Sequence, residues 1–160
     1  MGSSIVPAAS VTTPSDNWVQ IAATNPAATS LNFTSISGYK KLMTFWDNGS
    51  TSASLTSYRF NSDSGTKYQR SGWGWDTAVT VKSAYTTSAA DNGNNNQHRL
   101  IVTSADNTNM KEFTEYVGGA TVSKFFLVNG IYQATAAITS INLVWGATFS
   151  QTVYLYGVAA

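Results

Sequence analysis

Short alternations of hydrophobic and polar residues recur along the chain from residue 18 onward. In residues 30–36, polar residues separate Leu31 and Phe33, so the large apolar side chains repeat with a period of two. Successive side chains of an extended strand point to opposite faces, and this period predicts a strand with one buried face. Residues 152–158 repeat the pattern, with valine and leucine on one face and two tyrosines on the other.

About ten such runs are rich in β-branched and aromatic residues and are separated by Gly, Asn, Asp and Ser clusters, which is typical of an all-β sandwich. The runs predicted to form strands are residues 18–24, 30–36, 40–46, 55–60, 79–84, 98–104, 111–117, 123–128, 138–145 and 152–158. No window keeps helical spacing for long, so we expect at most one helical turn. The sequence therefore predicts an all-β fold, an antiparallel β-sandwich of about 8–10 strands.

Asn-Gly and Asp-rich segments predict the turns between these runs. They are Asn48-Gly49, Asp91-Asn92-Gly93 and Asn129-Gly130, because Asn and Gly readily adopt positive φ. We expect a hairpin at Asn129-Gly130. The low-complexity stretch at residues 89–96 predicts an exposed loop.

The first 16 residues differ from the rest of the chain. They are small and polar and contain Pro7 and Pro14, and proline removes backbone donors and favours extended conformations. We expect an extended arm at residues 1–16, followed by one sandwich domain at residues 17–160. The arm has neither a basic segment nor a continuous apolar stretch, so we expect no secretory signal and no export.

Composition narrows the classes of function. Charged residues make up only 11% of the chain, against about 25% in an average globular domain, so we expect a polar but weakly charged surface. A formal charge of +1 provides no field that would attract nucleic acid or an anionic membrane, and we expect neither partner. Without cysteine there is no disulfide and no thiolate zinc site.

Residues able to run an enzymatic reaction are scarce. His98 is the only histidine and there is no cysteine, which argues against a catalytic triad. We expect His98 at the surface or on an edge strand. Glu112 and Glu115 lie three residues apart on a predicted strand and should point to opposite faces, which argues against a joint catalytic role. The remaining acids, predicted at turns, are Asp16, Asp47, Asp63, Asp76, Asp91 and Asp106. We therefore expect no enzyme and no cofactor.

Two local motifs leave alternatives open. Residues 61–65 (NSDSG) are rich in oxygen ligands but lack the spacing of a calcium-binding loop, which favours a tight turn held by Asn and Asp side chains. Trp73 and Trp75 flank Gly74 and would share one face of a strand. Core packing, a subunit interface and a platform for sugars are all compatible with that pair, in this order of preference.

Four segments together resemble a group of tailed-bacteriophage virion proteins. They are YKKL (39–42), YRFNSDSGTKY (58–68), ITSI (138–141) and FSQTVYLYGV (149–158). The group shares an opening Trp strand, an RFNxDxGxxY strand and turn, and a closing strand that ends in LYGv. This chain departs from the pattern at Gln151, where the group has glycine.

The resemblance implies a jelly-roll or concanavalin-like sandwich that forms homotrimers, as a head decoration protein or in tail fibres, and it brings no catalytic residues. We expect a capsid decoration (cement) protein on the outer surface of the virion, assembled in the host cytoplasm, with the major capsid protein and itself as partners. The residues expected to contact partners are Ile5, Val6, Pro7, Val11 and Pro14 of the arm, together with Trp73 and Trp75. The alternative is a tail-associated module that binds a host glycan through Trp73, Trp75 and residues 91–96.

Overall fold

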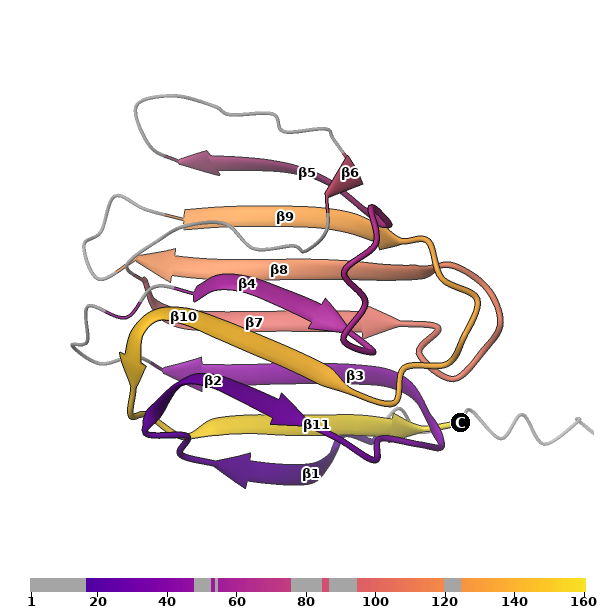
Figure 1. Cartoon of the computed structure of the whole chain (residues 1–160), viewed down its shortest axis with the longest axis horizontal. Coiled ribbons are helices and arrows are strands. Elements are labelled where there is room, and N and C mark those ends of the chain that lie inside the picture. The colour runs from indigo at the N-terminus through magenta and orange to yellow at the C-terminus, as the bar shows by residue number, and fades with distance from the viewer. Residues whose placement is uncertain (1–16, 48–52, 54, 76–84, 87–94, 120–124) are drawn as a thin grey trace, which may run out of the picture.

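The structure, a computed structural model, describes residues 17–47, 53, 55–75, 85–86, 95–119 and 125–160. Within these residues the chain forms eleven strands and no helix, and every strand pairing is antiparallel, as predicted from the period-two pattern (Figure 1). The predicted arm at residues 1–16 lies outside the described residues.

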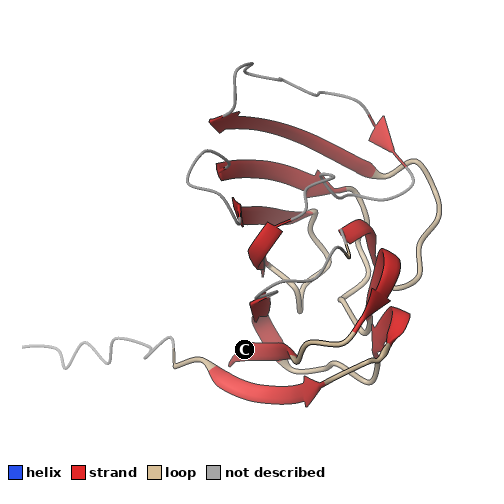
Figure 2. Ribbon diagram, turned by 90° about the vertical axis from the view of Figure 1, so that its left-hand side faces the viewer, coloured by secondary structure: helices blue, strands red, loops and turns tan. Residues whose placement is uncertain are grey.

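The strands form two sheets. In chain order they are β1 (Val19–Thr24), β2 (Ala28–Phe33), β3 (Tyr39–Asp47), β4 (Leu55–Phe60), β5 (Tyr68–Trp75), β6 (Tyr85–Thr86), β7 (Asn95–Thr103), β8 (Lys111–Gly119), β9 (Phe125–Tyr132), β10 (Ile141–Phe149) and β11 (Val153–Ala159). Eight strands form one sheet in the order β1-β11-β3-β7-β8-β9-β5-β6, and the other sheet has the order β2-β10-β4. In the turned view the eight-stranded sheet curves round one side of the smaller sheet (Figure 2).

The hydrophobic core lies between the two sheets. Alternate residues of each strand supply it, for example Leu42 of β3, Leu100 of β7 and Leu155 of β11, all fully buried. From the smaller sheet, Phe60 and Leu143 are likewise fully buried. The side chains between these positions point outward, so each sheet has one face in the core and one outer face.

Nine of the predicted runs coincide with or overlap observed strands, and residues 55–60 match β4 residue for residue. The predicted strand at residues 79–84 lies outside the described residues, as do the predicted turns at residues 48–49 and 91–93. The predictions did not include β5 among the runs. Its tyrosine, glycines and tryptophans do not alternate with polar residues in the way that marks a half-buried strand.

The hairpin predicted at Asn129-Gly130 is wrong. Both residues lie inside β9, which pairs with β5 on one side and β8 on the other. Gly130 serves a different purpose here, because a Cβ at this position would collide with the ring of Phe113 on β8. The glycine makes room for an aromatic side chain on the neighbouring strand, which local sequence does not reveal.

Candidate functional site

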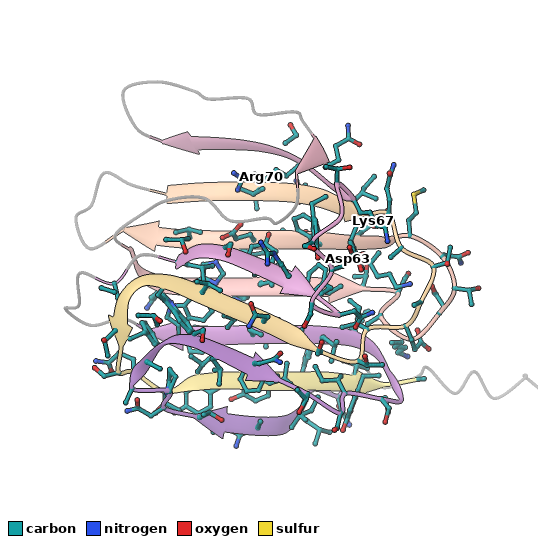
Figure 3. The ribbon with its side chains drawn as sticks, viewed as in Figure 1. Asp63, Lys67 and Arg70 are labelled. Atoms are coloured by element: carbon teal, nitrogen blue, oxygen red, sulfur yellow. The ribbon has the colours of Figure 1, made fainter. Side chains whose placement is uncertain are left out.

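The turn between β4 and β5 is held by a side-chain network that we call the Asp63 lock, consisting of Asp63, Gly65, Lys67, Tyr68 and Tyr132. Asp63 Oδ1 accepts a hydrogen bond from the Gly65 amide at 2.8 Å. Its Oδ2 accepts from Lys67 Nζ and from the Tyr132 hydroxyl, each at 2.8 Å. Figure 3 shows Asp63 and Lys67 together at this end of the sandwich.

Electrostatics in the lock follow from these contacts. The hydrogen bond from Lys67 lowers the pKa of Asp63, with further contributions from Gly65 and Tyr132, although partial burial opposes the shift. Burial raises the pKa of Tyr68 to about 12. The Tyr68 hydroxyl accepts a hydrogen bond from the Phe60 amide at 2.9 Å, which joins the turn to the end of β4.

Asn61 ties the same turn to the segment before β10. Its Oδ1 accepts hydrogen bonds from the amides of Thr139 at 2.7 Å and Ser140 at 3.2 Å, and its Nδ2 donates to the Ala137 carbonyl at 2.8 Å. Asn61 has a positive φ of 55°, a backbone conformation that asparagine tolerates better than most residues. With both Asp63 oxygens bonded within the protein, residues 61–65 form the tight turn that the sequence predicts.

A second polar network lies in the middle of the sandwich. We call it the Glu115 cluster; it contains Tyr58 of β4, His98 of β7 and Glu115 of β8. His98 Nε2 lies 2.6 Å from Glu115 Oε1, and the Tyr58 hydroxyl donates to Glu115 Oε2 at 3.2 Å. Burial is the main cause that raises the pKa of Tyr58 well above its ordinary value, and the charge of Glu115 adds to the shift.

The prediction of His98 at the surface or on an edge strand is wrong. His98 is only 4% exposed, because β7 lies inside the sheet between β3 and β8. Its ring stacks on Trp46 with the centroids 4.0 Å apart. A buried imidazole is tolerated here because Glu115 provides a hydrogen-bond partner and Trp46 covers its face.

The Glu115 cluster is closed to solvent. Tyr58 and Glu115 have no exposed surface, so a substrate in solution cannot reach either group. Three buried atoms beside or near it, His98 Nδ1, Thr44 Oγ1 and Trp145 Nε1, have no hydrogen-bond partner among the described residues. We interpret the cluster as structural. As predicted, Glu112 and Glu115 point to opposite faces of β8, with Glu112 exposed.

Lys111, at the start of β8, is fully buried. Its ammonium group donates hydrogen bonds to the carbonyls of Asn107 at 2.7 Å, Asn109 at 2.6 Å and Ala134 at 3.1 Å. Three backbone oxygens therefore replace water around the charge, and the contacts join the β7–β8 loop to the segment after β9. Burial lowers the pKa of Lys111.

Within the described residues, no second layer covers the outer face of the eight-stranded sheet. Over β11, β3 and β7 this face carries a group of large apolar side chains, which we call the aromatic half, with Lys41 and Arg99 beside them on the same face. Its residues, each half-buried, are Met43, Phe45, Ile101, Tyr154 and Tyr156. The rings of Phe45 and Tyr154 lie 6.5 Å apart, and those of Tyr154 and Tyr156 lie 6.3 Å apart.

The other part of this face, over β8, β9 and β5, is hollowed and is lined by several residues with polar side chains. An open groove of about 440 Å³ is lined there by Gln69, Ser71, Glu112, Thr114, Asn129 and Ile131, together with the residues between them on the three strands. A second depression of about 470 Å³ shares Glu112 and Ile131 with it and continues to Met110 and Thr135. We call the two together the groove. None of its outward side chains was singled out from the sequence as a ligand-binding residue, because strand pairing alone brings them together.

The residues predicted to contact partners are placed only in part. Trp73 and Trp75 lie on β5, paired with Leu127 and Phe125 of β9. Their side chains lie outside the described residues. The arm residues Ile5, Val6, Pro7, Val11 and Pro14 also lie outside them. Of the acids predicted at turns, Asp63 and Asp106 lie in described turns. The prediction is wrong for Asp47, which is the last residue of β3 and pairs with Gln97 of β7.

Within the part of the chain that the structure describes, no three His, Asp or Glu side chains come close enough together to hold a metal ion. The same residues contain no helix long and apolar enough to span a membrane. Comparison of the chain with known protein families, with curated proteins and with solved structures finds no match.

Proposed function

We propose that this chain is a structural protein of a tailed-bacteriophage virion, a capsid decoration (cement) protein that forms a homotrimer and binds the major capsid protein on the outer surface of the head. In this proposal the chain catalyses no reaction and uses no cofactor. The motif resemblance of residues 39–42, 58–68 and 149–158 supports it at the level of sequence.

The aromatic half is the observation that carries the proposal. Phe45, Tyr154 and Tyr156 are half-buried on a face that the smaller sheet does not cover. By contrast, the outward residues of the three-stranded sheet are mostly polar: Ser30, Asn32, Ser57, Arg59, Asn142 and Val144. Contiguous apolar surface rimmed by polar residues marks interaction sites, and aromatic residues are enriched at the centre of protein interfaces. We assign the aromatic half to contacts between subunits of the trimer.

The strand order supports a jelly roll. In the larger sheet β11 lies between β1 and β3, and in the smaller sheet β10 lies between β2 and β4. Strands from the end of the chain thus alternate with strands from its beginning in both sheets, which is the interleaving expected of the Greek keys of a jelly roll. The hairpin of β8 and β9 then extends the larger sheet and joins β5 to it.

Sedimentation velocity tests the trimer. Phe45→Ser combined with Tyr154→Ser should convert a trimer to a monomer, because both large outward side chains are lost from the interface. Asn32→Ala combined with Ser30→Ala, on the outer face of the smaller sheet, should leave the trimer intact. A wild-type protein that sediments as a monomer at every concentration would contradict the proposal.

Particle binding tests the location. The predicted extended arm at residues 1–16 could add a strand to a sheet edge on the capsid, where main-chain hydrogen bonds provide the affinity. Deleting residues 1–16 should leave a folded trimer that no longer binds expanded heads. Unchanged occupancy of heads by the shortened protein would show that the arm is not the attachment segment.

A second candidate is a tail-associated module that binds a host glycan through Trp73, Trp75 and residues 91–96. The groove beside β5, on the strand that carries both tryptophans, favours a ligand-binding role in general. Quantifying the protein in purified virions separates the two candidates: a copy number that matches the capsomers indicates decoration, and a few copies confined to the tail indicate receptor binding.

A further inference from the structure

We propose that the groove over β8, β9 and β5 binds a neutral oligosaccharide, with Gln69, Glu112 and Asn129 forming hydrogen bonds to its hydroxyl groups. The proposed contacts are residues other than Trp73 and Trp75. It goes beyond the decoration function, and its occupation does not depend on whether the protein lies on the head or the tail.

Strand register places the polar side chains of the groove in two rows across the sheet. Gln69 of β5 pairs with Ile131 of β9, which pairs with Glu112 of β8. The second row lies two residues further along each strand. It consists of Ser71 of β5, Asn129 of β9 and Thr114 of β8, paired in the same order. Residues that alternate with these, such as Tyr68 and Phe113, are buried in the core, so the two rows lie on the outer face.

The chemistry of the rows suits a sugar. Amide, hydroxyl and carboxylate groups supply both donors and acceptors, and each sugar hydroxyl is itself a donor and an acceptor. Thr114 Oγ1 donates to Asn129 Oδ1 at 3.0 Å, which orients the amide so that its two N–H donors remain for a ligand. Ile131 lies between Gln69 and Glu112 and offers an apolar contact for the C–H face of a ring.

The dimensions favour more than one sugar ring. The two depressions, of about 440 and 470 Å³, meet at Glu112 and Ile131, and each lies within the range of about 300–1,000 Å³ that is usual for small-ligand pockets. Their arrangement end to end fits a short chain better than a single compact molecule. The exposed Met110 lies in the second depression and provides a further apolar contact.

Charge favours a neutral ligand. Glu112 is the acidic residue of the groove, and it would repel a carboxylate or a phosphate. The lining also includes Arg70. Because Arg70 lies between Gln69 and Ser71 on β5, its side chain points to the inner face of the sheet, away from the groove. On that side the positive charge of Arg70 lowers the pKa of the buried Tyr58, while burial raises it. Figure 3 shows Arg70 in front of β9, on the side of the smaller sheet.

Nuclear magnetic resonance with defined probes tests the site. The ¹⁵N-labelled full-length protein is titrated with maltose, lactose and N,N′-diacetylchitobiose, and with 3′-sialyllactose as an anionic probe, each to about 50 mM, which detects Kd values in the millimolar range. We expect saturable shifts from at least one neutral probe, confined to the amides of residues 69–71, 112–114 and 129–131.

Single substitutions then assign the contacts. Glu112→Gln and Asn129→Ala should each weaken binding by about tenfold or more. The first replaces a charged carboxylate acceptor by a neutral amide, and the second removes the amide altogether. Both residues are exposed, so the variants should fold, and their unbound spectra verify this. Asn142→Ala, on the outer face of the smaller sheet, is the matched control and should bind as the wild type does.

Three results would overturn the inference: no saturable shift with any neutral probe, binding that survives both substitutions, or saturation by 3′-sialyllactose alone. None of them bears on the decoration function, which is measured by occupancy of heads. Conversely, a protein that binds sugar through the groove but not heads would overturn the decoration proposal and leave the groove assigned.

Discussion

The Asp63 lock and the Glu115 cluster are both networks of polar side chains, but they differ in how these side chains come together. In the lock, Asp63, Gly65 and Lys67 lie within five residues of one another, and both carboxylate oxygens are bonded. In the cluster, Glu115 meets His98 and Tyr58 from two other strands, 17 and 57 residues away.

The difference shows which contacts depend on residues close in sequence and which depend on strands that come together only in the folded chain. The lock can form as soon as the turn forms, because most of its partners are neighbours in sequence. The cluster exists only when β4, β7 and β8 are all in place, and His98 Nδ1 still lacks a partner among the described residues. Removing a member of the cluster should therefore lower the free energy of unfolding more than removing a member of the lock.

Glu115→Ala should have the largest effect. It leaves His98 and the Tyr58 hydroxyl buried without their partner, and breaking a buried polar pair of this kind lowers the free energy of unfolding by about 3–5 kcal/mol. Urea denaturation measures the loss. Glu112→Ala on the exposed side of the same strand is the control and should change the free energy by less than about 0.5 kcal/mol. Equal losses of stability in both variants would contradict the expectation that the buried contacts of Glu115 stabilise the fold.

Asp63→Asn should have the next largest effect, a loss of about 1.5–3 kcal/mol, because charge-assisted hydrogen bonds from Lys67 and Tyr132 are weakened. The pKa of Asp63 is lowered from its ordinary value of 3.8 in the folded protein. Its contribution is therefore fully present above that value and is lost as the pH falls through the folded pKa. The wild type should lose stability below pH 3.8 more steeply than Asp63→Asn. Ser64→Ala, which removes no titratable group from the same turn, should retain the wild-type slope.

Gly130→Ala disturbs Phe113, a ring that lies next to members of both networks. The ring of Phe113 lies 5.7 Å from that of Tyr58 in the cluster and 6.0 Å from that of Phe60, whose amide binds Tyr68 of the lock. A methyl group at Gly130 would displace Phe113, and overpacking of this kind costs about 1–3 kcal/mol. Phe113→Leu in the same chain should recover part of the loss. Additive losses in the double variant would exclude a direct clash.

Tyr68→Phe should have the smallest effect, a loss of about 0.5–1.5 kcal/mol from the hydrogen bond with the Phe60 amide. Because the folded pKa of Tyr68 is raised from 10.0 to about 12, its contribution is present below pH 10 and is lost as the pH rises toward 12. Stability measured between these pH values should fall less in Tyr68→Phe than in the wild type. If stability falls equally with pH in both proteins, the loss at high pH must come from groups other than Tyr68.

The sequence by itself determined what depends on near neighbours. Alternation located most of the strands and assigned their faces, so Leu31, Phe33 and Val153 turned out more buried than the residues between them. The tight turn at residues 61–65 was predicted because asparagine and aspartate bond to nearby backbone and favour turns. The opposite faces of Glu112 and Glu115 followed from the same period of two.

Only the tertiary structure decided what depends on which strands are neighbours. The partner of His98, the reason for Gly130 and the rows of the groove all arise from the pairing of β8 with β7 and β9. Local sequence carries no signal for such pairing, because the energy of a buried polar group or a glycine depends on the residue opposite it on another strand. For that reason, a histidine that the sequence suggested would be exposed lies in the core, and a glycine that suggested a turn lies inside a strand.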